Sequence, residues 1–367
     1  MIPTGGPSFD IVIPTLGRPS LGPLLGSLAA GDGPMPGTVF VVDDLPAWQA
    51  GTMQLPSGGA LAPRTRVLRS GGRGPAAARN VGWRASTAGW VAFLDDDVVP
   101  PHGWRTALAV DLHKCGPDVG ATQGRIHVPL PAGRAATDWE RNVGRLANAR
   151  WATADMAYRR EALEAVGGFD ERFPSAYRED ADLGLRVVGA GYKIIRGARS
   201  VEHPVRPADP WVSLRLQRGN ADDALMRAKH GPRWRTAACV PRGRRPWHLT
   251  TVTAAGTAMA ALAARRPRLA AVAALAWAGL TMDLIRIRVT PGPGTAGEVG
   301  TMAVTSLAMP FVATWHWLRG TLRWRGLART TQPAPVPDYE AHEFPSPLDH
   351  AFESSTPLIP AGPGGSK

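Results

Sequence analysis

Short apolar runs, two of which lead directly into carboxylates, place the strongest constraint on the fold of this chain. These runs are residues 9–14, 38–44, 66–69 and 90–94. Residues 75–85 lie between the last two and predict a helix, because they begin with proline and are rich in alanine. Strands that alternate with helices predict an α/β fold with a doubly wound, mostly parallel sheet.

The acids that follow two of these strands suggest a binding site. They are Asp43, Asp44, Asp95, Asp96 and Asp97. In a doubly wound sheet, ligands bind beyond the carboxyl ends of the strands, so both groups of acids are expected on one edge. Three consecutive carboxylates repel one another unless a cation intervenes, which favours Mg²⁺ or Mn²⁺ together with substrate phosphates. The alternative is an exposed acidic turn.

A second acidic cluster and one histidine are further candidates. Glu179, Asp180 and Asp182 begin a predicted helix over residues 179–189, where they could supply a general base or only cap the helix. His203 could be a metal ligand, although most histidines are not. Other predicted elements are strands at 152–158 and 192–195 and helices at 160–166 and 211–229.

The charge of the chain is concentrated in its C-terminal part. The formal net charge is +12, and residues 205–330 hold 19 basic and 5 acidic side chains. This region also contains apolar stretches at 249–264, 269–285 and 299–318. The first two are shorter than the roughly 20 residues that span a bilayer. We therefore expect a hairpin in the cytoplasmic leaflet with arginine on anionic headgroups, or else an alanine-rich soluble bundle.

Other partners and compartments are less favoured by the sequence. The arginines are not interleaved with aromatic residues in a known motif, so we expect no nucleic-acid partner. Cys115 and Cys239 cannot form a disulfide framework, which favours a reducing compartment. Residues 1–10 lack the pattern of a secretory signal, so we expect the first domain on the cytoplasmic side of the membrane. The tail from 331, rich in proline and acids, is expected to be disordered.

Taken in order, the motifs over residues 9–230 resemble those of the family 2 glycosyltransferases. They are Ile-Val-Ile-Pro-Thr15 with Arg18, Val-Val-Asp43-Asp44, Arg79-Asn80-Val-Gly82, Leu-Asp95-Asp96-Asp97, Ala-Tyr-Arg-Arg160, Gly-Gly-Phe-Asp170, Glu179-Asp180-Ala-Asp182 and Glu-His203-Pro. The resemblance implies a GT-A, Rossmann-like fold and an inverting transfer from a nucleotide-sugar donor. It also implies bacterial, membrane-associated relatives that act on glycan or lipid-linked acceptors of the cell envelope.

The resemblance assigns expected roles to individual residues. Thr15, Arg18 and Asp43 or Asp44 match base and ribose contacts, and Arg79 matches the residue that follows the base-binding loop. Asp95 matches the ribose side of the DxD motif, and Arg79, Asp95 and Asp96 are expected to bind the donor. Asp97 and His203 match the metal ligands. Asp180 matches the catalytic base, and Glu179 orients it or shares its role. Two departures concern Asp155, where the family commonly carries asparagine, and Leu45-Pro46, where small residues are usual.

These features predict four regions and leave two other functions open. The regions are a catalytic domain (1–204), a basic helical connector (205–248), an apolar helical region (249–330) and the tail (331–367). A sugar-phosphate nucleotidyltransferase would share the sheet and the metal, but residues 13–18 lack its glycine-rich loop. A non-catalytic, membrane-bound scaffold that binds nucleotide-sugars is the other alternative. The sequence does not indicate an oligomeric state.

Overall fold

A seven-stranded sheet is the centre of the computed structural model, which describes residues 7–49 and 59–327. Its strands are β1 (Phe9–Thr15), β2 (Val39–Asp43), β3 (Thr65–Arg69), β4 (Trp90–Leu94), β5 (Val119–His127), β6 (Asp155–Arg159) and β7 (Lys193–Glu202). They are arranged in the order β3-β2-β1-β4-β6-β5-β7. β6 runs antiparallel to β4 and β5, and the other pairs are parallel. The sheet is therefore mostly parallel, as predicted.

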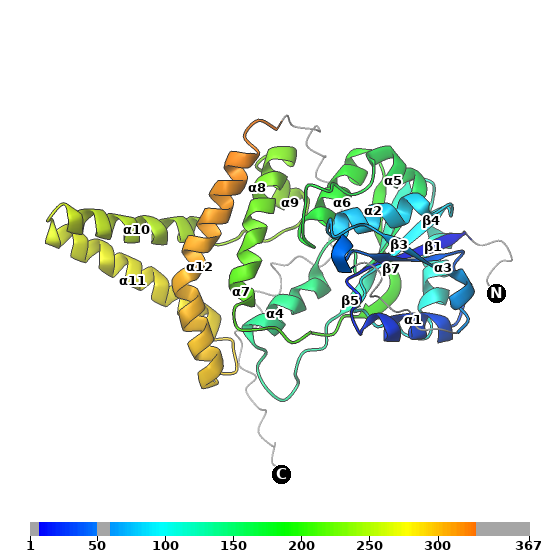
Figure 1. Cartoon of the computed structure of the whole chain (residues 1–367), viewed down its shortest axis with the longest axis horizontal. Coiled ribbons are helices and arrows are strands. Elements are labelled where there is room, and N and C mark those ends of the chain that lie inside the picture. The colour runs from blue at the N-terminus through cyan, green and yellow to red at the C-terminus, as the bar shows by residue number, and fades with distance from the viewer. Residues whose placement is uncertain (1–6, 50–58, 328–367) are drawn as a thin grey trace, which may run out of the picture.

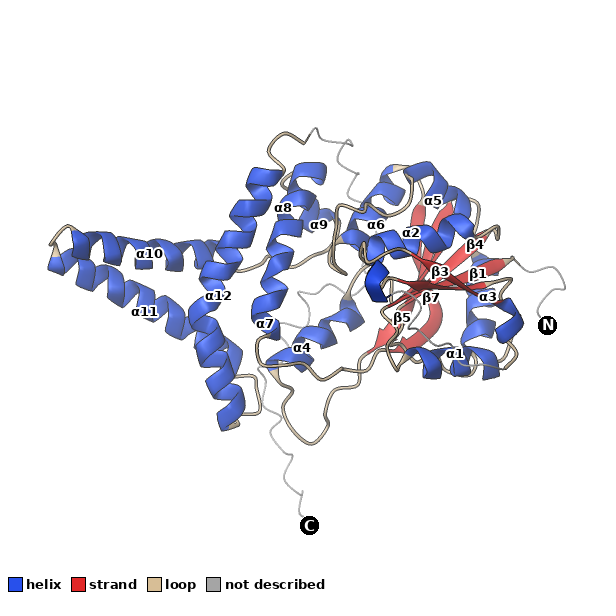
Figure 2. Ribbon diagram, viewed as in Figure 1, coloured by secondary structure: helices blue, strands red, loops and turns tan. Residues whose placement is uncertain are grey.

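Helices cover both faces of this sheet (Figure 2). They are α1 (Leu21–Ala30), α2 (Pro75–Ala85), α3 (Trp104–Lys114), α5 (Arg160–Val166) and α6 (Glu179–Gly189). A further helix, α4 (Asp138–Gly144), lies to the side of the sheet. One buried cluster contains residues of α1 and α3, and the other contains residues of α2, α5 and α6. Central strands such as β1 and β4 are apolar on both sides because each face meets one of these clusters. The doubly wound α/β class is confirmed.

Several predicted elements agree with the structure, and others differ for physical reasons. The helices predicted at 75–85, 160–166 and 179–189 have those bounds. The local sequence patterns did not predict α1, α3, α4 and β5. β5 contains two glycines, which are unusual inside a strand. A Cβ added at Gly124 would lie 2.1 Å from Asp155 Oδ2, so only glycine leaves room here for the Asp155 side chain.

The helix predicted in the basic connector is divided into shorter segments. The single helix expected at 211–229 is instead α7 (Val212–Arg215), a 3₁₀ turn (Leu216–Arg218) and α8 (Gly219–His230). The short helix α9 (Trp234–Ala237) follows. The last strand is also longer than the predicted 192–195, since β7 continues to Glu202 and ends directly before His203.

Three long helices follow, α10 (Arg245–Ala263), α11 (Pro267–Val289) and α12 (Ala296–Arg323). Figure 1 shows α10 and α11 as a hairpin that projects away from the sheet, while α12 lies beside α8. By length and composition, α11 and α12 could each cross a membrane. At 23 residues, α11 is longer than its predicted apolar stretch, so the expectation that it is too short to span is wrong. Residues 331–367 lie outside the described part of the chain.

Candidate active site

The ends of β1, β2 and β4 lie at one edge of the sheet because these strands are parallel neighbours. Asp96, which follows β4, is buried there and binds one residue at the end of β1 and one in the loop after it. Thr15 Oγ1 donates a 2.7 Å hydrogen bond to Asp96 Oδ2, and Arg18 Nη1 donates one of 2.7 Å to Oδ1. The structure thus brings together three of the predicted donor-binding residues.

The two acids at the end of β2 have different surroundings. Asp43 Oδ1 accepts a hydrogen bond of 2.9 Å from the Leu45 backbone N–H. Asp44 Oδ1 accepts one of 2.6 Å from Ser70 Oγ, and both of its carboxylate oxygens accept from the Gly74 N–H. Asp44 therefore fixes the loop that leads into α2, and this structural task accounts for its burial.

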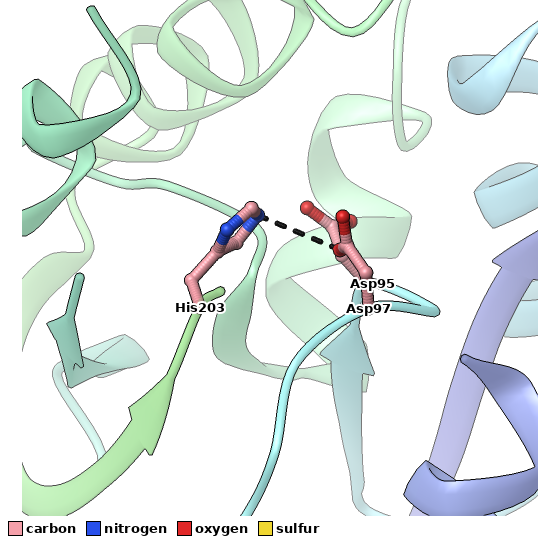
Figure 3. A group of neighbouring side chains, drawn as sticks. All are labelled: Asp95, Asp97 and His203. Atoms are coloured by element: carbon pink, nitrogen blue, oxygen red, sulfur yellow. Dashed lines mark ion pairs between the residues drawn. The ribbon is translucent and has the colours of Figure 1, made fainter. Parts of the chain in front are cut away.

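A three-residue cluster at the same edge has the donor set of a divalent cation site (Figure 3). One ligand atom from each of Asp95, Asp97 and His203 lies within 4.8 Å of the other two. His203 reaches the acidic loop because its neighbour Glu202 and Val99 exchange two backbone hydrogen bonds, of 2.8 and 3.0 Å. Two carboxylates and one imidazole suit Mg²⁺ or Mn²⁺.

The electrostatics of Asp97 agree with a cation at this position. Burial raises the pKa of Asp97, and the charges of Asp95 and Asp96 raise it further, although His203 and Arg206 oppose them. A divalent ion would remove this penalty by neutralising the carboxylates. Arg206 Nε lies 2.8 Å from Asp97 Oδ2. Arg206 was not among the predicted site residues, and its place three residues after His203 was the available signal.

Glu179 and Asp180 form an acid pair at the start of α6. Arg178, with a positive φ of 77°, turns the chain into this helix. Glu179 is buried, and burial together with the charge of Asp180 raises its pKa to about 8 despite the neighbouring Arg79. Burial also raises the pKa of Asp180, whose Oδ1 accepts a 2.7 Å hydrogen bond from the Ala181 N–H. Carboxylates with raised pKa values are suited to proton transfer near neutral pH.

Asp182 and Asp155, by contrast, have structural partners. Asp182 accepts hydrogen bonds from Arg186 and His230, and its pKa is lowered by them and by Lys229 although burial opposes this. It thus joins α6 to α8. Asp155 is fully buried on β6.

Asp155 belongs to a buried ion network beneath the sheet edge. Its carboxylate accepts hydrogen bonds of 2.9 Å from Trp104 Nε1 and 2.7 Å from Arg199 Nε. Arg199 also binds Asp111 (3.1 Å) and the Thr122 carbonyl (2.7 Å). Asp155 therefore has an internal counter-ion, Arg199, which is 44 residues away in sequence and gives no local signal of the pairing.

The doubly wound sheet thus carries a candidate cation cluster at its strand ends and an acid pair at the start of α6. Residues 10–164 match the family model described as "Glycosyl transferase family 2". The pre-mycofactocin glycosyltransferase of Mycobacterium tuberculosis, in strains CDC 1551 / Oshkosh and ATCC 25618 / H37Rv, is 35% identical over 135 residues. The aligned part is 33% of this chain and 28% of that relative's length.

Solved structures of glycosyltransferases are more distant. The mannosyltransferase PcManGT from Pyrobaculum calidifontis, in complex with GDP-Man and Mn²⁺, is 17% identical with a TM-score of 0.43. That match covers 88% of this chain and 87% of the other. GalNAc-T7 with UDP, GalNAc and Mn²⁺ is 16% identical with a TM-score of 0.39, over 56% of this chain and 45% of the other. Scores this low carry no information about substrates here.

Proposed function

We propose that this protein is an inverting, metal-dependent glycosyltransferase that moves a sugar from a nucleoside-diphosphate sugar to an acceptor hydroxyl. The observation that carries the proposal is the placement of two acidic groups in a family 2 domain. Asp95, Asp97 and His203 form the cation cluster, and Arg79 joins it to the acid pair at the start of α6.

The cation cluster would hold Mg²⁺ or Mn²⁺ through Asp97 and His203, with Asp95 beside them. A bound cation would neutralise charge that grows on the departing diphosphate. Thr15, Arg18 and Asp96, joined by hydrogen bonds, would contact the donor next to this cluster. Asp43 lies at the end of the adjacent strand and would contact the base or ribose, with Asp44 supporting that loop.

The acid pair would supply the base. An acceptor hydroxyl has a pKa far above 7, so a carboxylate must take its proton as the oxygen attacks the anomeric carbon. Asp180 would do this. Glu179, held by the Arg79 guanidinium, would orient Asp180 or share its role. Attack from the side opposite the diphosphate inverts the anomeric centre.

The C-terminal helices support an acceptor held at a membrane. Large apolar side chains are exposed along α11 and α12, at Leu269, Val272, Leu275, Met282, Val304, Leu307, Phe311, Trp315, Leu318 and Leu322. On α12 they recur every three or four residues and form one stripe. Arg265, Arg266 and Arg268 lie in and beside the turn between α10 and α11, where they would meet anionic headgroups.

We therefore propose that the protein acts at the cytoplasmic face of the cell membrane. Its acceptor would be a glycan or lipid-linked molecule of the cell envelope. The apolar stripe would rest in the bilayer, and the acidic edge of the sheet would remain in water.

A donor panel tests this function. Wild type, Asp97→Asn and Asp180→Asn would be incubated with UDP-, GDP- and dTDP-sugars, Mn²⁺ and membrane extracts. Release of nucleoside diphosphate by wild type, lost in both variants without a change in circular dichroism, supports the proposal. Full activity in either variant contradicts it. Pyrophosphate release from a nucleoside triphosphate and a sugar phosphate would instead indicate a nucleotidyltransferase, and nucleotide binding without turnover would indicate a scaffold.

A further inference from the structure

Arg79 occupies an unusual position between the two halves of the proposed site. Its side chain is only 2% exposed, although it lies on α2 beside the binding edge of the sheet. Nη1 donates a 2.9 Å hydrogen bond to Glu179 Oε1, and Nη2 donates one of 2.8 Å to Asp95 Oδ1. One guanidinium therefore binds an acid of the cation cluster and an acid of the base pair at the same time.

The helix that carries Arg79 is itself firmly held. Asn80 donates a 2.9 Å hydrogen bond to the Phe169 carbonyl and accepts one of 2.9 Å from the Phe169 N–H. Gly82 lies against β1, where an added Cβ would be 2.3 Å from a methyl group of Val12. The Arg79 guanidinium also stacks over the Phe169 ring, 5.6 Å from its centre. These contacts explain the Arg-Asn-Val-Gly sequence and leave Arg79 little freedom to move.

The chemistry of the pairing favours arginine specifically. A guanidinium is planar and presents its N–H groups in a fixed fork, so its two ends set both the distance and the direction between two carboxylates. A lysine ammonium at this place would be a single charged point. The nitrogen of Arg79 that makes neither of these bonds, Nε, is buried and has no partner among the described residues. Arg79 is thus turned toward the protein acids and away from solvent.

We propose that Arg79 is a positioning residue that fixes Asp95 and Glu179 relative to each other. It thereby keeps the cation cluster that holds the donor at a fixed distance and direction from the acid pair that supplies the base. The inference rests on the proposed function, and it assigns Arg79 a role behind the donor rather than a direct contact with the nucleotide. Misplacement of reacting groups by about 1 Å can cost about 100-fold in rate.

The role has an electrostatic consequence that separates it from simpler ones. Arg79 places positive charge on Asp95, one member of the cation cluster. Removing that charge leaves Asp95 more available to a divalent ion, so Mn²⁺ should bind as tightly or more tightly while turnover falls. A residue that only supported the fold would lower both quantities when removed. A nucleotide contact would weaken the binding of nucleoside diphosphates.

The experiment compares wild type, Arg79→Met, Arg79→Lys and Arg84→Met. Arg84 lies on the same helix, has a side chain 51% exposed and serves as the matched control. Mn²⁺ binding is measured by electron paramagnetic resonance, and UDP, GDP and dTDP binding by calorimetry in the presence of Mn²⁺. Turnover is followed with whichever UDP-, GDP- or dTDP-sugar wild type consumes. Circular dichroism and melting temperature report folding.

We expect Arg79→Met to lose about 100-fold in kcat, with KM for the donor and Mn²⁺ affinity no worse than in wild type. Arg79→Lys should lose about tenfold, since it keeps the charge but not the fork, and Arg84→Met should match wild type. If Arg79→Lys turns over at the wild-type rate, the inference about Arg79 is overturned and the proposed function is not. Weaker nucleotide binding by a folded Arg79→Lys would also overturn it. Absence of Mn²⁺ binding and turnover in wild type would overturn the proposed function itself.

Discussion

Replacing Arg199 by methionine should destabilise the protein strongly, because Arg199 is the cation of the buried network under the sheet edge. Its side chain is inaccessible to solvent and pairs with Asp155 at 2.7 Å and Asp111 at 3.1 Å. Methionine has similar length but no charge. The variant would leave two buried carboxylates without a counter-ion.

The expected loss follows from the burial of these groups. Removing one partner of a buried ion pair costs about 3–5 kcal/mol. At about 2–4 °C per kcal/mol for a domain of this size, a loss of about 4 kcal/mol lowers the melting temperature by roughly 8–16 °C. Adding Asp155→Asn should restore part of the loss, because it removes one of the two orphaned acids.

Thermal denaturation of Arg199→Met, Asp155→Asn and the double variant forms a double-mutant cycle. Lys193→Met is the control, since Lys193 starts the same strand but its ion pair with Asp118 is exposed. The reasoning predicts that the double variant melts above Arg199→Met and that Lys193→Met melts near wild type. Strictly additive losses would refute the pairing. Loss of turnover at unchanged melting temperature in Asp155→Asn would show that Asp155 acts in the reaction.

Three further outcomes are expected. Burial and Asp223 raise the pKa of Asp222 to about 7 from 3.8, so its ionisation destabilises the native state as pH rises from about 4 to 7. Asp222→Asn should have the melting temperature of wild type at pH 4 and a higher one at pH 8, where its unfolding free energy should exceed that of wild type by at most about 4 kcal/mol. Equal melting temperatures at pH 8 would contradict this. Arg206→Ala removes the charge paired with Asp97, so Mn²⁺ alone should bind at least as tightly in a calorimetric titration. Weaker Mn²⁺ binding would contradict the idea that Arg206 and the cation compete for the Asp97 carboxylate. The protein should float with anionic vesicles in a density gradient and resist release by 1 M salt, whereas Leu307→Glu together with Phe311→Glu should not float; complete release of wild type by salt would mean that arginine alone attaches it.

The sequence predicted the features that depend on local patterns. Runs such as 90–94 are apolar because both faces of the strand are covered, and their ends could be assigned to one edge because parallel strands share a direction. The helix at 179–189 begins with acids and 75–85 begins with proline, and both have the predicted bounds.

Features that depend on long-range contacts were not predictable. β5 gives little strand signal because Gly120 and Gly124 make room for Tyr192 and Asp155, which are distant in sequence. The ion pairs of Arg79 with Glu179 and of Arg206 with Asp97 likewise join separate segments. The sequence shows which residues are charged. Which of them form ion pairs depends on how α2, α6 and the end of β7 pack together.

The central claim is that the acidic edge of the sheet binds a divalent cation together with a nucleoside diphosphate. Isothermal titration of wild type and Asp97→Asn with UDP, GDP and dTDP, each with and without Mn²⁺, tests it most directly. We predict that wild type binds one of these nucleotides only when Mn²⁺ is present, and that Asp97→Asn loses this dependence and most of the affinity. Binding by wild type that is indifferent to Mn²⁺, or unchanged in Asp97→Asn, would contradict the account.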